Sequence, residues 1–398
     1  LRRPARVWKD RVMKRNVAAL LAVGTVAVFT QAPPASPQAP ELRGQQLPAP
    51  VRAGRKPQYR AALPPYTFRF PRDHAAHPEY QTEWWYYTGH LYSGARKWGY
   101  ELTFFQIGID PERKRSRSEW ALHTLYFAHF TITDENGRSF RFMEQVSRPA
   151  LGMAGAETGR YRVWIHDWSA GLLPDGRTHR IHADAPGFGL TLDLLSLKPP
   201  VVHGFNGVSQ KSEGAGRASH YYSLTRLKTN GTLRVGGEKI PVTGVSWMDH
   251  EFGSNQLTAE QAGWDWFSIQ LDGNRELMLY QLRLKDGGVE PLSSGTLVRA
   301  DGTWKHLPLS AFEIRPTGTW RSPKSGGIYP AGWTIRVPGE ALELRVLPTV
   351  PDQELWTEGT GVRYWEGSVR VEGRSGGKPV GGVGYVELTG YAGPAPGI

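Results

Sequence analysis

The feature that most restricts the fold of this chain is a series of long, β-rich runs separated by short turn sequences. Residues 99–109, 119–133 and 187–197 are rich in aromatic and β-branched side chains, and apolar and polar positions partly alternate along them. This pattern is typical of strands that bury at least one face. Short strands joined by turns predict an all-β, antiparallel sandwich or barrel. The turns are marked by pairs of Asn or Asp with glycine, at Asn136-Gly137, Asp175-Gly176, Asn230-Gly231, Asp272-Gly273 and Asp301-Gly302.

The same strand pattern occurs twice along the chain. Residues 84–91 (WWYYTGHL) resemble residues 264–271 (WDWFSIQL), and residues 241–249 (PVTGVSWMD) resemble residues 379–387 (PVGGVGYVE). A chain of 398 residues also exceeds the size at which a single core stops growing. We therefore predict two related β-domains, over residues 66–254 and 255–398. Each begins with an aromatic hairpin and ends with an aromatic-x-acid strand.

The N-terminal segment differs in composition from the rest of the chain. Residues 1–60 carry twelve Lys and Arg but only two acidic residues, so nearly all of the net charge of +11 lies there. Met13-Lys14-Arg15 precedes an apolar run over residues 17–29 and then small residues, which is the layout of a secretory signal peptide. We predict a signal peptide over residues 1–35, with an uncleaved membrane anchor as the alternative, and a disordered linker over residues 36–65. The balanced charge of the remainder gives no electrostatic case for nucleic acid.

Cysteine is missing from the chain. This excludes a disulfide framework, a Cys-ligated metal and a Cys nucleophile. Export without disulfides is compatible with a bacterial periplasm, so we expect a periplasmic or secreted protein. His123 and His129 lie six residues apart in an apolar run, and His179 and His182 lie beside turn residues. Neither spacing is a strong metal-ligand pattern, so we predict no metal and no other cofactor.

The strand expected near residues 120–132 is largely apolar on both faces. A strand turns successive side chains to opposite sides, so neither face of this one is expected to meet much water. A small barrel that packs one side against the partner domain would have this pattern, and so would a barrel that encloses an apolar cavity. Both arrangements remain open from the sequence.

Carboxylates recur beside tryptophan. They occur in Glu83-Trp84-Trp85, in Trp247-Met248-Asp249-His250-Glu251 and in Trp264-Asp265-Trp266. The sequence contains no nucleophile elbow, phosphate-binding loop, HExxH zinc motif or dinucleotide-binding turn. Asp249 shares a strand face with Trp247 and Val245, so we expect its carboxyl to lie among apolar groups with a raised pKa. Glu83 and Asp265 are expected to pair or cap, because neighbouring strand positions face apart.

Several segments together resemble the AttH-like proteins of the carotenoid 1,2-hydratase superfamily, whose members are often labelled as secreted hydrolases. The resemblance covers roughly residues 74–390 and rests on HPEYQTEWWYYTGHLYS, KWGYELTFF, YFAHFTITD, SWMDHEFGSNQL and GWDWFSIQLDGNRELMLYQLR. It implies two tandem lipocalin-like β-barrels and an exported protein, often encoded beside ABC-transporter components. The His-x-Trp segment of the hydratases is similar to His250-Glu251-Phe252, in which Phe replaces Trp. Hydratases of this superfamily add water to an isolated alkene of an acyclic carotenoid.

Alkene hydration by this route needs a neutral carboxylic acid, electron-rich rings beside the developing cation and a group that orients water. The predicted catalytic residues are Asp249 as proton donor, with His250 or Glu251 orienting water. The predicted ligand-binding residues, on the inner walls of the barrels, are Trp84, Trp247, Trp264, Asp265 and Trp266. The first expectation is an exported protein that binds an apolar lipid or isoprenoid ligand, and catalysis is an extension of that binding. Two non-catalytic alternatives remain open. One is a periplasmic carrier of a lipid or other apolar molecule, such as an accessory protein of an ABC transporter, and the other is a module that docks on a membrane protein.

Overall fold

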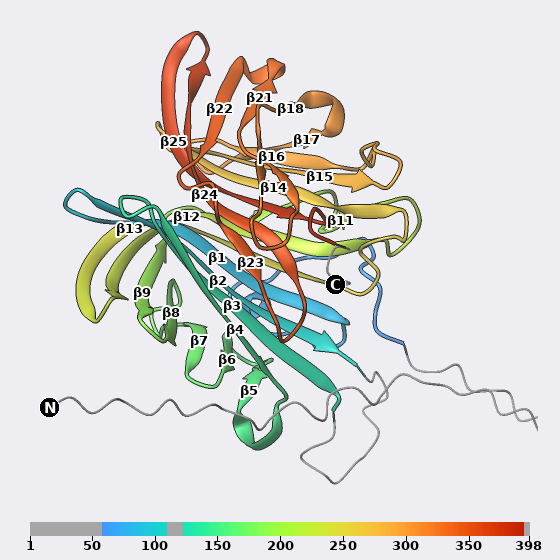
Figure 1. Ribbon diagram of the computed structural model, residues 1–398. Helices are drawn as coiled ribbons and strands as arrows, with labels where there is room; N and C mark the ends of the chain where they lie inside the picture. Colours follow the sequence, from blue (N-terminus) through green and yellow to red (C-terminus); the bar gives the residue numbers. More distant parts are fainter. Residues whose placement is uncertain (1–57, 110–121, 394–398) are drawn as a thin grey trace, which may run out of the picture. The chain divides into compact units, whose positions relative to one another are not determined.

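The computed structural model describes residues 58–109 and 122–393, and their regular structure consists of strands and short 3-10 helices (Figure 1). The predicted signal peptide, most of the predicted linker and the start of the strand expected over residues 119–133 lie outside these ranges. No helix in the described ranges is long and apolar enough to cross a membrane. The 3-10 helices are η1 (Arg72–His74), η2 (Ala150–Gly152), η3 (Leu309–Ala311) and η4 (Pro338–Glu340).

An antiparallel sheet of thirteen strands forms the first half of the described chain, in the order β4-β3-β2-β1-β13-β12-β9-β8-β7-β6-β5, with β10 and β11 paired to β12. The sheet curls into a barrel, so that β3 and β4 return to contact β6. Its strands are β1 (Thr82–Ser93), β2 (Arg96–Gly108), β3 (Thr124–Asp134), β4 (Ser139–Ser147), β5 (Ala154–Ala156), β6 (Arg162–Ile165), β7 (Trp168–Leu172), β8 (Thr178–Ala185), β9 (Phe188–Ser196), β10 (Val201–Val202), β11 (Ser209–Gln210), β12 (Ala218–Val235) and β13 (Glu238–Gly253).

A second antiparallel sheet of ten strands follows, in the order β17-β16-β15-β14-β25-β24-β22-β21-β18, with β23 paired to β24. A separate hairpin joins β19 and β20. The strands are β14 (Gln261–Leu271), β15 (Arg275–Leu284), β16 (Ser294–Val298), β17 (Trp304–Pro308), β18 (Glu313–Pro316), β19 (Thr319–Arg321), β20 (Ile328–Pro330), β21 (Trp333–Val337), β22 (Leu342–Pro348), β23 (Glu354–Trp356), β24 (Arg363–Ser375) and β25 (Lys378–Thr389). The all-β, two-barrel prediction is therefore confirmed.

The repeated sequences occupy equivalent strands in the two sheets. The first and last strands of each sheet pair with one another, β1 with β13 and β14 with β25. In the first pair Tyr86 lies opposite Asp249, and in the second Trp266 lies opposite Glu387. Tyr86 and Trp266 are the same position of one repeated segment, and Asp249 and Glu387 are the same position of the other.

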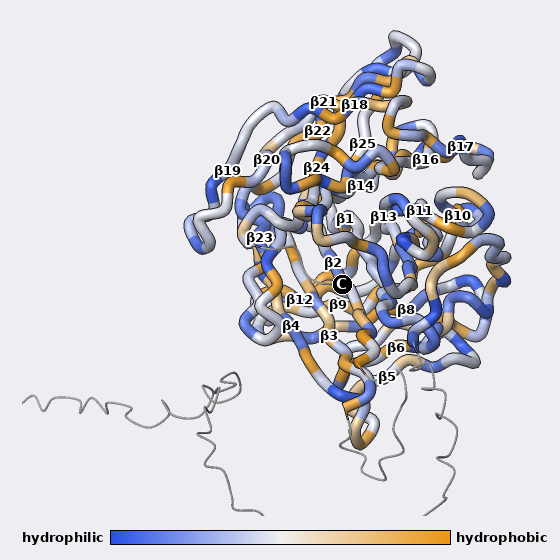
Figure 2. Tube along the Cα trace, turned by 90° about the vertical axis from the view of Figure 1, so that its right-hand side faces the viewer, coloured by the Kyte–Doolittle hydropathy of each residue, from blue (hydrophilic) through white to orange (hydrophobic). Residues whose placement is uncertain are grey.

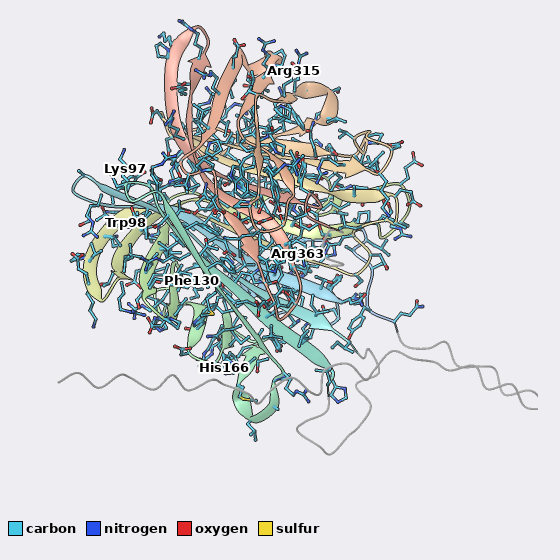
Figure 3. The ribbon with its side chains drawn as sticks, in the orientation of Figure 1. Lys97, Trp98, Phe130, His166, Arg315 and Arg363 are labelled. Atoms are coloured by element: carbon cyan, nitrogen blue, oxygen red, sulfur yellow. The ribbon has the colours of Figure 1, made fainter. Side chains whose placement is uncertain are left out.

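Each sheet encloses its own apolar core, and a third cluster fills the space between the sheets. Hydrophobic and hydrophilic segments are interspersed along the chain in both sheets (Figure 2). The first core contains Trp85 and Tyr87 together with Phe130, which Figure 3 labels. Trp84 and Tyr86, the alternate residues of β1, belong instead to the cluster between the sheets. The consecutive rings of β1 are therefore divided between the barrel interior and the contact with the second sheet, because successive side chains of a strand face opposite ways.

Candidate active site

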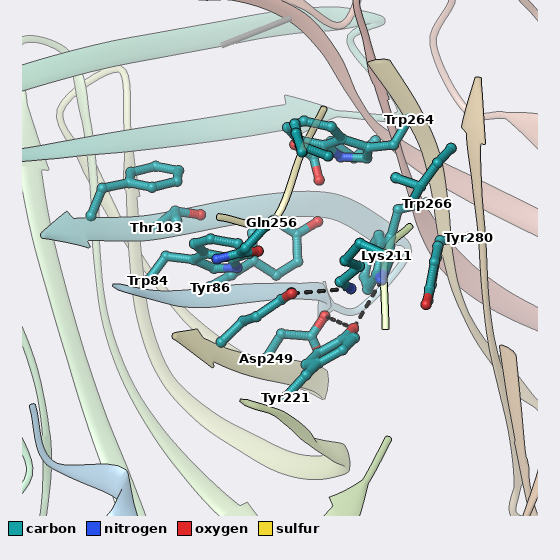
Figure 4. Close-up of a pocket in the computed structure, with 15 residues that line it drawn as sticks. Trp84, Tyr86, Thr103, Lys211, Tyr221, Asp249, Gln256, Trp264, Trp266 and Tyr280 are labelled. Atoms are coloured by element: carbon teal, nitrogen blue, oxygen red, sulfur yellow. Dashed lines mark hydrogen bonds and ion pairs between the residues drawn. The ribbon is translucent and has the colours of Figure 1, made fainter. Parts of the chain in front are cut away.

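Between the two sheets lies a cavity of about 90 Å³ (Figure 4). This is room for several water molecules or a small chemical group. Its walls combine aromatic and aliphatic side chains with three carboxyl groups and one amine, drawn from both sheets. The lining residues are Trp84, Tyr86, Thr103, Phe105, Lys211, Tyr221, Asp249, Glu251, Gln256, Leu257, Trp264, Trp266, Tyr280, Leu282 and Glu387.

Asp249 projects from β13 into this cavity and is held by three hydrogen-bond donors. The Tyr221 hydroxyl donates to Oδ2 at 2.8 Å, and the indole N–H of Trp247 donates to Oδ1 at 2.6 Å. Ser223 also donates to Oδ1. Burial raises the pKa of Asp249 to about 7, although the three donors act against this rise because they stabilise the carboxylate. The raised pKa of Asp249 is the property expected from its sequence context.

Ser223 connects Asp249 to a buried histidine behind the cavity wall. The Ser223 hydroxyl lies 2.7 Å from Nε2 of His203, and Nδ1 of His203 lies 2.8 Å from the hydroxyl of Thr296 on the second sheet. Burial holds the pKa of His203 well below its usual value, so this imidazole is neutral. A neutral histidine adds no opposing charge beside Asp249.

Glu251, two residues further along β13, forms an ion pair with Lys211 at 3.0 Å and accepts a hydrogen bond from Ser219. The Lys211 ammonium also lies 5.0 Å from the ring centre of Tyr221 and 4.4 Å from that of Tyr280. Burial acts to lower the pKa of Lys211, but Glu251, Tyr280 and Asp249 together outweigh it and the pKa is raised. Lys211 therefore keeps its positive charge beside Glu251.

Glu387 brings a further carboxyl to the cavity, from β25 of the second sheet. Its pKa is raised to about 7, chiefly by burial and also by the charge of Asp249, while a hydrogen bond from Trp264 acts to lower it. Behind it, Glu366 lies directly opposite on β24, and Glu101 of the first sheet is close enough for all three carboxyls to interact. Burial and mutual repulsion hold the pKa of Glu366 and of Glu101 well above the usual value, which favours their neutral forms.

The predicted site residues fall into two groups. Asp249, Glu251, Trp84, Trp264 and Trp266 line the cavity, while Trp247 is buried beside it and donates to Asp249. His250 and Asp265 lie elsewhere.

The separation of His250 and Asp265 from the cavity follows from strand alternation. His250 points into the first barrel, where it stacks on Trp85 with ring centres 4.9 Å apart. Asp265 accepts hydrogen bonds from Arg283 and Tyr391. The expected position of the site also needs correction, because the carboxyls lie between the barrels rather than on their inner walls, and packed apolar clusters occupy the barrel interiors.

Sequence reasoning missed Lys211, Tyr221, Tyr280 and Glu387. Lys211 and Tyr221 lie in segments without a distinctive motif, and Tyr280 lies in a segment that resembles the family but is separated in sequence from the carboxyls. Glu387 did carry a signal, because it is the counterpart of Asp249 in the internal repeat. Asp249 and Glu387 line the same cavity only because the two sheets pack against each other. That packing could not be predicted from the sequence.

These features define a two-barrel, all-β protein with an acidic and aromatic cavity between its barrels. The chain belongs to the AttH-like family, whose family model matches residues 61–391. A crystal structure described as an AttH protein, from Nitrosomonas europaea, is 33% identical with a TM-score of 0.75, and the match covers 83% of this chain and 99% of that one. Kievitone hydratase from Nectria haematococca shares the fold at 17% identity and a TM-score of 0.63, covering 85% of this chain and 98% of that one. No curated protein matches the chain in sequence.

Proposed function

We propose that this protein binds an apolar molecule with an isolated alkene, of the isoprenoid or lipid class, and adds water to it in the cavity between the sheets. The observation that carries the proposal is the pair of carboxyls, buried Asp249 and partly buried Glu387, that line one aromatic cavity from equivalent strands. Hydration needs an acid and a base at one place, and two interacting carboxyls that share one proton supply both.

The surroundings of the two carboxyls assign their roles. Asp249 accepts three hydrogen bonds, which favour its carboxylate, whereas Glu387 accepts one. The charge of Asp249 also raises the pKa of Glu387. Both pKa values lie at about 7, so the two carboxyls share about one proton near neutral pH. We assign the carboxylate, and with it the role of base, to Asp249, and the role of acid to Glu387. The sequence alone assigned the acid role to Asp249, because the donors around it could not be foreseen.

The reaction then balances with water as the only co-reactant. Glu387 transfers its carboxyl proton to the less substituted alkene carbon, and the π electrons form the new C–H bond. The tertiary cation lies among rings such as Trp84 and Trp266, whose faces attract positive charge. Asp249 takes a proton from the water whose oxygen forms the C–O bond. The product is a tertiary alcohol, and exchange with solvent returns the proton from Asp249 to Glu387.

Two further observations support this class of reaction and its setting. A relative with the same fold is described as a hydratase, kievitone hydratase. The charged, apolar and small-residue order of the N-terminal segment favours an exported protein that acts in the periplasm or outside the cell. A permease of an ABC transporter is the partner we infer from the family resemblance.

Non-catalytic carriage of an apolar ligand is the second candidate. It is favoured by the ion pair of Glu251 with Lys211 and by the complete hydrogen bonding of Asp249, since a binding site needs its buried polar groups satisfied but not reactive. Native mass spectrometry separates the two candidates. An enzyme releases its ligand with the mass of one water added, whereas a carrier returns it unaltered.

The direct test of the proposal is single-turnover hydration of an acyclic isoprenoid alkene by wild type, Glu387→Gln and Asp249→Asn. Removing a general acid or base costs about 100-fold or more in rate, and both variants should still bind the substrate. Asp265→Asn is the matched control, because Asp265 is a buried acid outside the cavity. Wild-type turnover in either carboxamide variant at the cavity would remove that residue from the mechanism.

A further inference from the structure

A second polar cluster lies inside the first barrel, on the faces of β1 and β13 that point away from the cavity. Oε1 of Glu83, on β1, lies 2.9 Å from Nδ1 of His77 and 2.7 Å from Nε2 of His250 on β13. The three atoms all lie within 4.8 Å of one another. Glu83 and His250 are fully buried and His77 is 4% exposed. The cluster plays no part in the proposed hydration, because strand alternation separates it from Asp249.

The chemistry of these atoms is that of a metal site. Two imidazole nitrogens and one carboxylate oxygen suit divalent first-row transition ions such as Zn²⁺. Ligand atoms about 2.1 Å from a common ion stand about 3.0 Å apart at right angles and about 3.4 Å apart at the tetrahedral angle. The two nitrogens lie slightly closer than that to Oε1, and all three atoms lie within 4.8 Å of one another, so small movements of the three side chains are needed to admit the ion.

Neighbouring polar groups contact the second ring nitrogen of both imidazoles, as is usual for histidines that bind a metal. Ligating histidines usually donate their second N–H to a carboxylate, a carbonyl or a similar acceptor. Nε2 of His77 lies 3.5 Å from the Tyr66 hydroxyl, with the charged Oδ1 of Asp73 at 3.7 Å, and Nδ1 of His250 lies 3.1 Å from the Tyr222 hydroxyl. Asp73 is itself fixed by the backbone N–H of Arg69 at 2.6 Å. These contacts leave Nδ1 of His77 and Nε2 of His250 facing Glu83.

Glu83 is oriented in the same way. Its Oε2 accepts the backbone N–H of His77 at 2.7 Å and the side-chain amide of Gln106 at 3.3 Å. These donors fix the carboxylate and leave Oε1 facing the two imidazoles. The three side chains belong to the segment before β1, to β1 and to β13, so an ion held here would fasten the N-terminal segment to the first and last strands of the barrel.

The geometry points to a structural site for one divalent transition-metal ion formed by His77, Glu83 and His250. Three protein ligands leave a fourth position for a water molecule, and the burial of all three ligands separates that position from substrate, which assigns the ion to folding rather than to catalysis. Its ligands come from parts of the sequence that meet only in the folded barrel, so metal binding is coupled to folding.

The test uses the full chain, purified without a histidine tag and refolded with and without Zn²⁺, with bound metal measured by elemental mass spectrometry. We expect one Zn²⁺ per chain and a higher thermal midpoint with the ion. His77→Gln should lose the ion and that stabilisation. His182→Gln is the matched control, because His182 bonds only to the Thr191 hydroxyl at the surface and should keep both.

If His77→Gln does not fold, anomalous diffraction at the zinc edge from wild-type crystals locates the bound ion directly. The ion should lie within coordination distance of all three side chains. Three results would overturn the proposal: refolded wild type without zinc, an ion bound elsewhere, or a folded His77→Gln that keeps full occupancy. The cluster would then be a hydrogen-bonded group that closes the barrel.

Discussion

Replacing Asp249 with Asn should change how the stability of this protein depends on pH. Burial raises the pKa of Asp249 from 3.8 to about 7. Each pH unit of that rise costs about 1.4 kcal/mol, so ionised Asp249 costs the folded state about 4 kcal/mol. The sign follows from the direction of the shift. Between pH 3.8 and about 7 the folded chain holds a proton that the unfolded chain has lost, so stability falls as the pH rises and levels off above pH 7.

The Asn variant lacks this loss of stability. Relative to wild type, Asp249→Asn should therefore gain up to about 4 kcal/mol between pH 4 and pH 8. Loss of the Asp249 charge also lowers the pKa of Glu387, which acts in the same direction. The absolute difference at any one pH is smaller than the gain, because the Asn amide faces donors that suit a carboxylate.

Urea unfolding, followed by tryptophan fluorescence at several pH values, measures this difference directly. The control is Asp167→Asn at an exposed turn, which should leave the wild-type pH dependence in place. A constant stability difference between wild type and Asp249→Asn across this range would refute the reasoning, because it would show that Asp249 titrates alike in the folded and unfolded chains.

Two further predictions concern the charges around the cavity. An isoprenoid ammonium should bind more tightly than its neutral isostere by about 1–2 kcal/mol, because rings and carboxylates both attract a cation. This preference should grow as the pH rises through 7, where Asp249 and Glu387 ionise. Quenching of tryptophan fluorescence measures both affinities, and equal affinities would count against cation stabilisation. Lys211→Met leaves Glu251 buried without its partner and should lower the free energy of unfolding by about 3–5 kcal/mol. The double variant Lys211→Met/Glu251→Leu should regain most of that stability. A single variant as stable as wild type would show that the ion pair is not needed.

The sequence predicted the architecture well because strand periodicity and turn residues are local properties. The internal repeat located the first and last strands of both sheets, and the shared face of Trp247 and Asp249 predicted a buried acid. The strand expected near residues 120–132 is apolar on both faces, and most of β3 is buried.

The rest of the site could not be predicted because it depends on long-range pairing. Lys211 reaches Glu251 from a connection forty residues earlier in the chain. His250 adjoins Asp249 in the sequence but faces the opposite side, where it meets Glu83 and His77 from the other end of the domain. Proximity in sequence favoured His250 as a partner of Asp249, and the pleat of the strand separates them.

Isotope incorporation tests the central claim most directly. Wild-type protein is incubated with an acyclic isoprenoid alkene in water labelled with heavy oxygen and deuterium, and the recovered ligand is analysed by mass spectrometry. The account predicts one labelled oxygen and one carbon-bound deuterium per converted molecule, and neither label with Glu387→Gln. Recovery of a bound but unlabelled ligand from the wild type would contradict it.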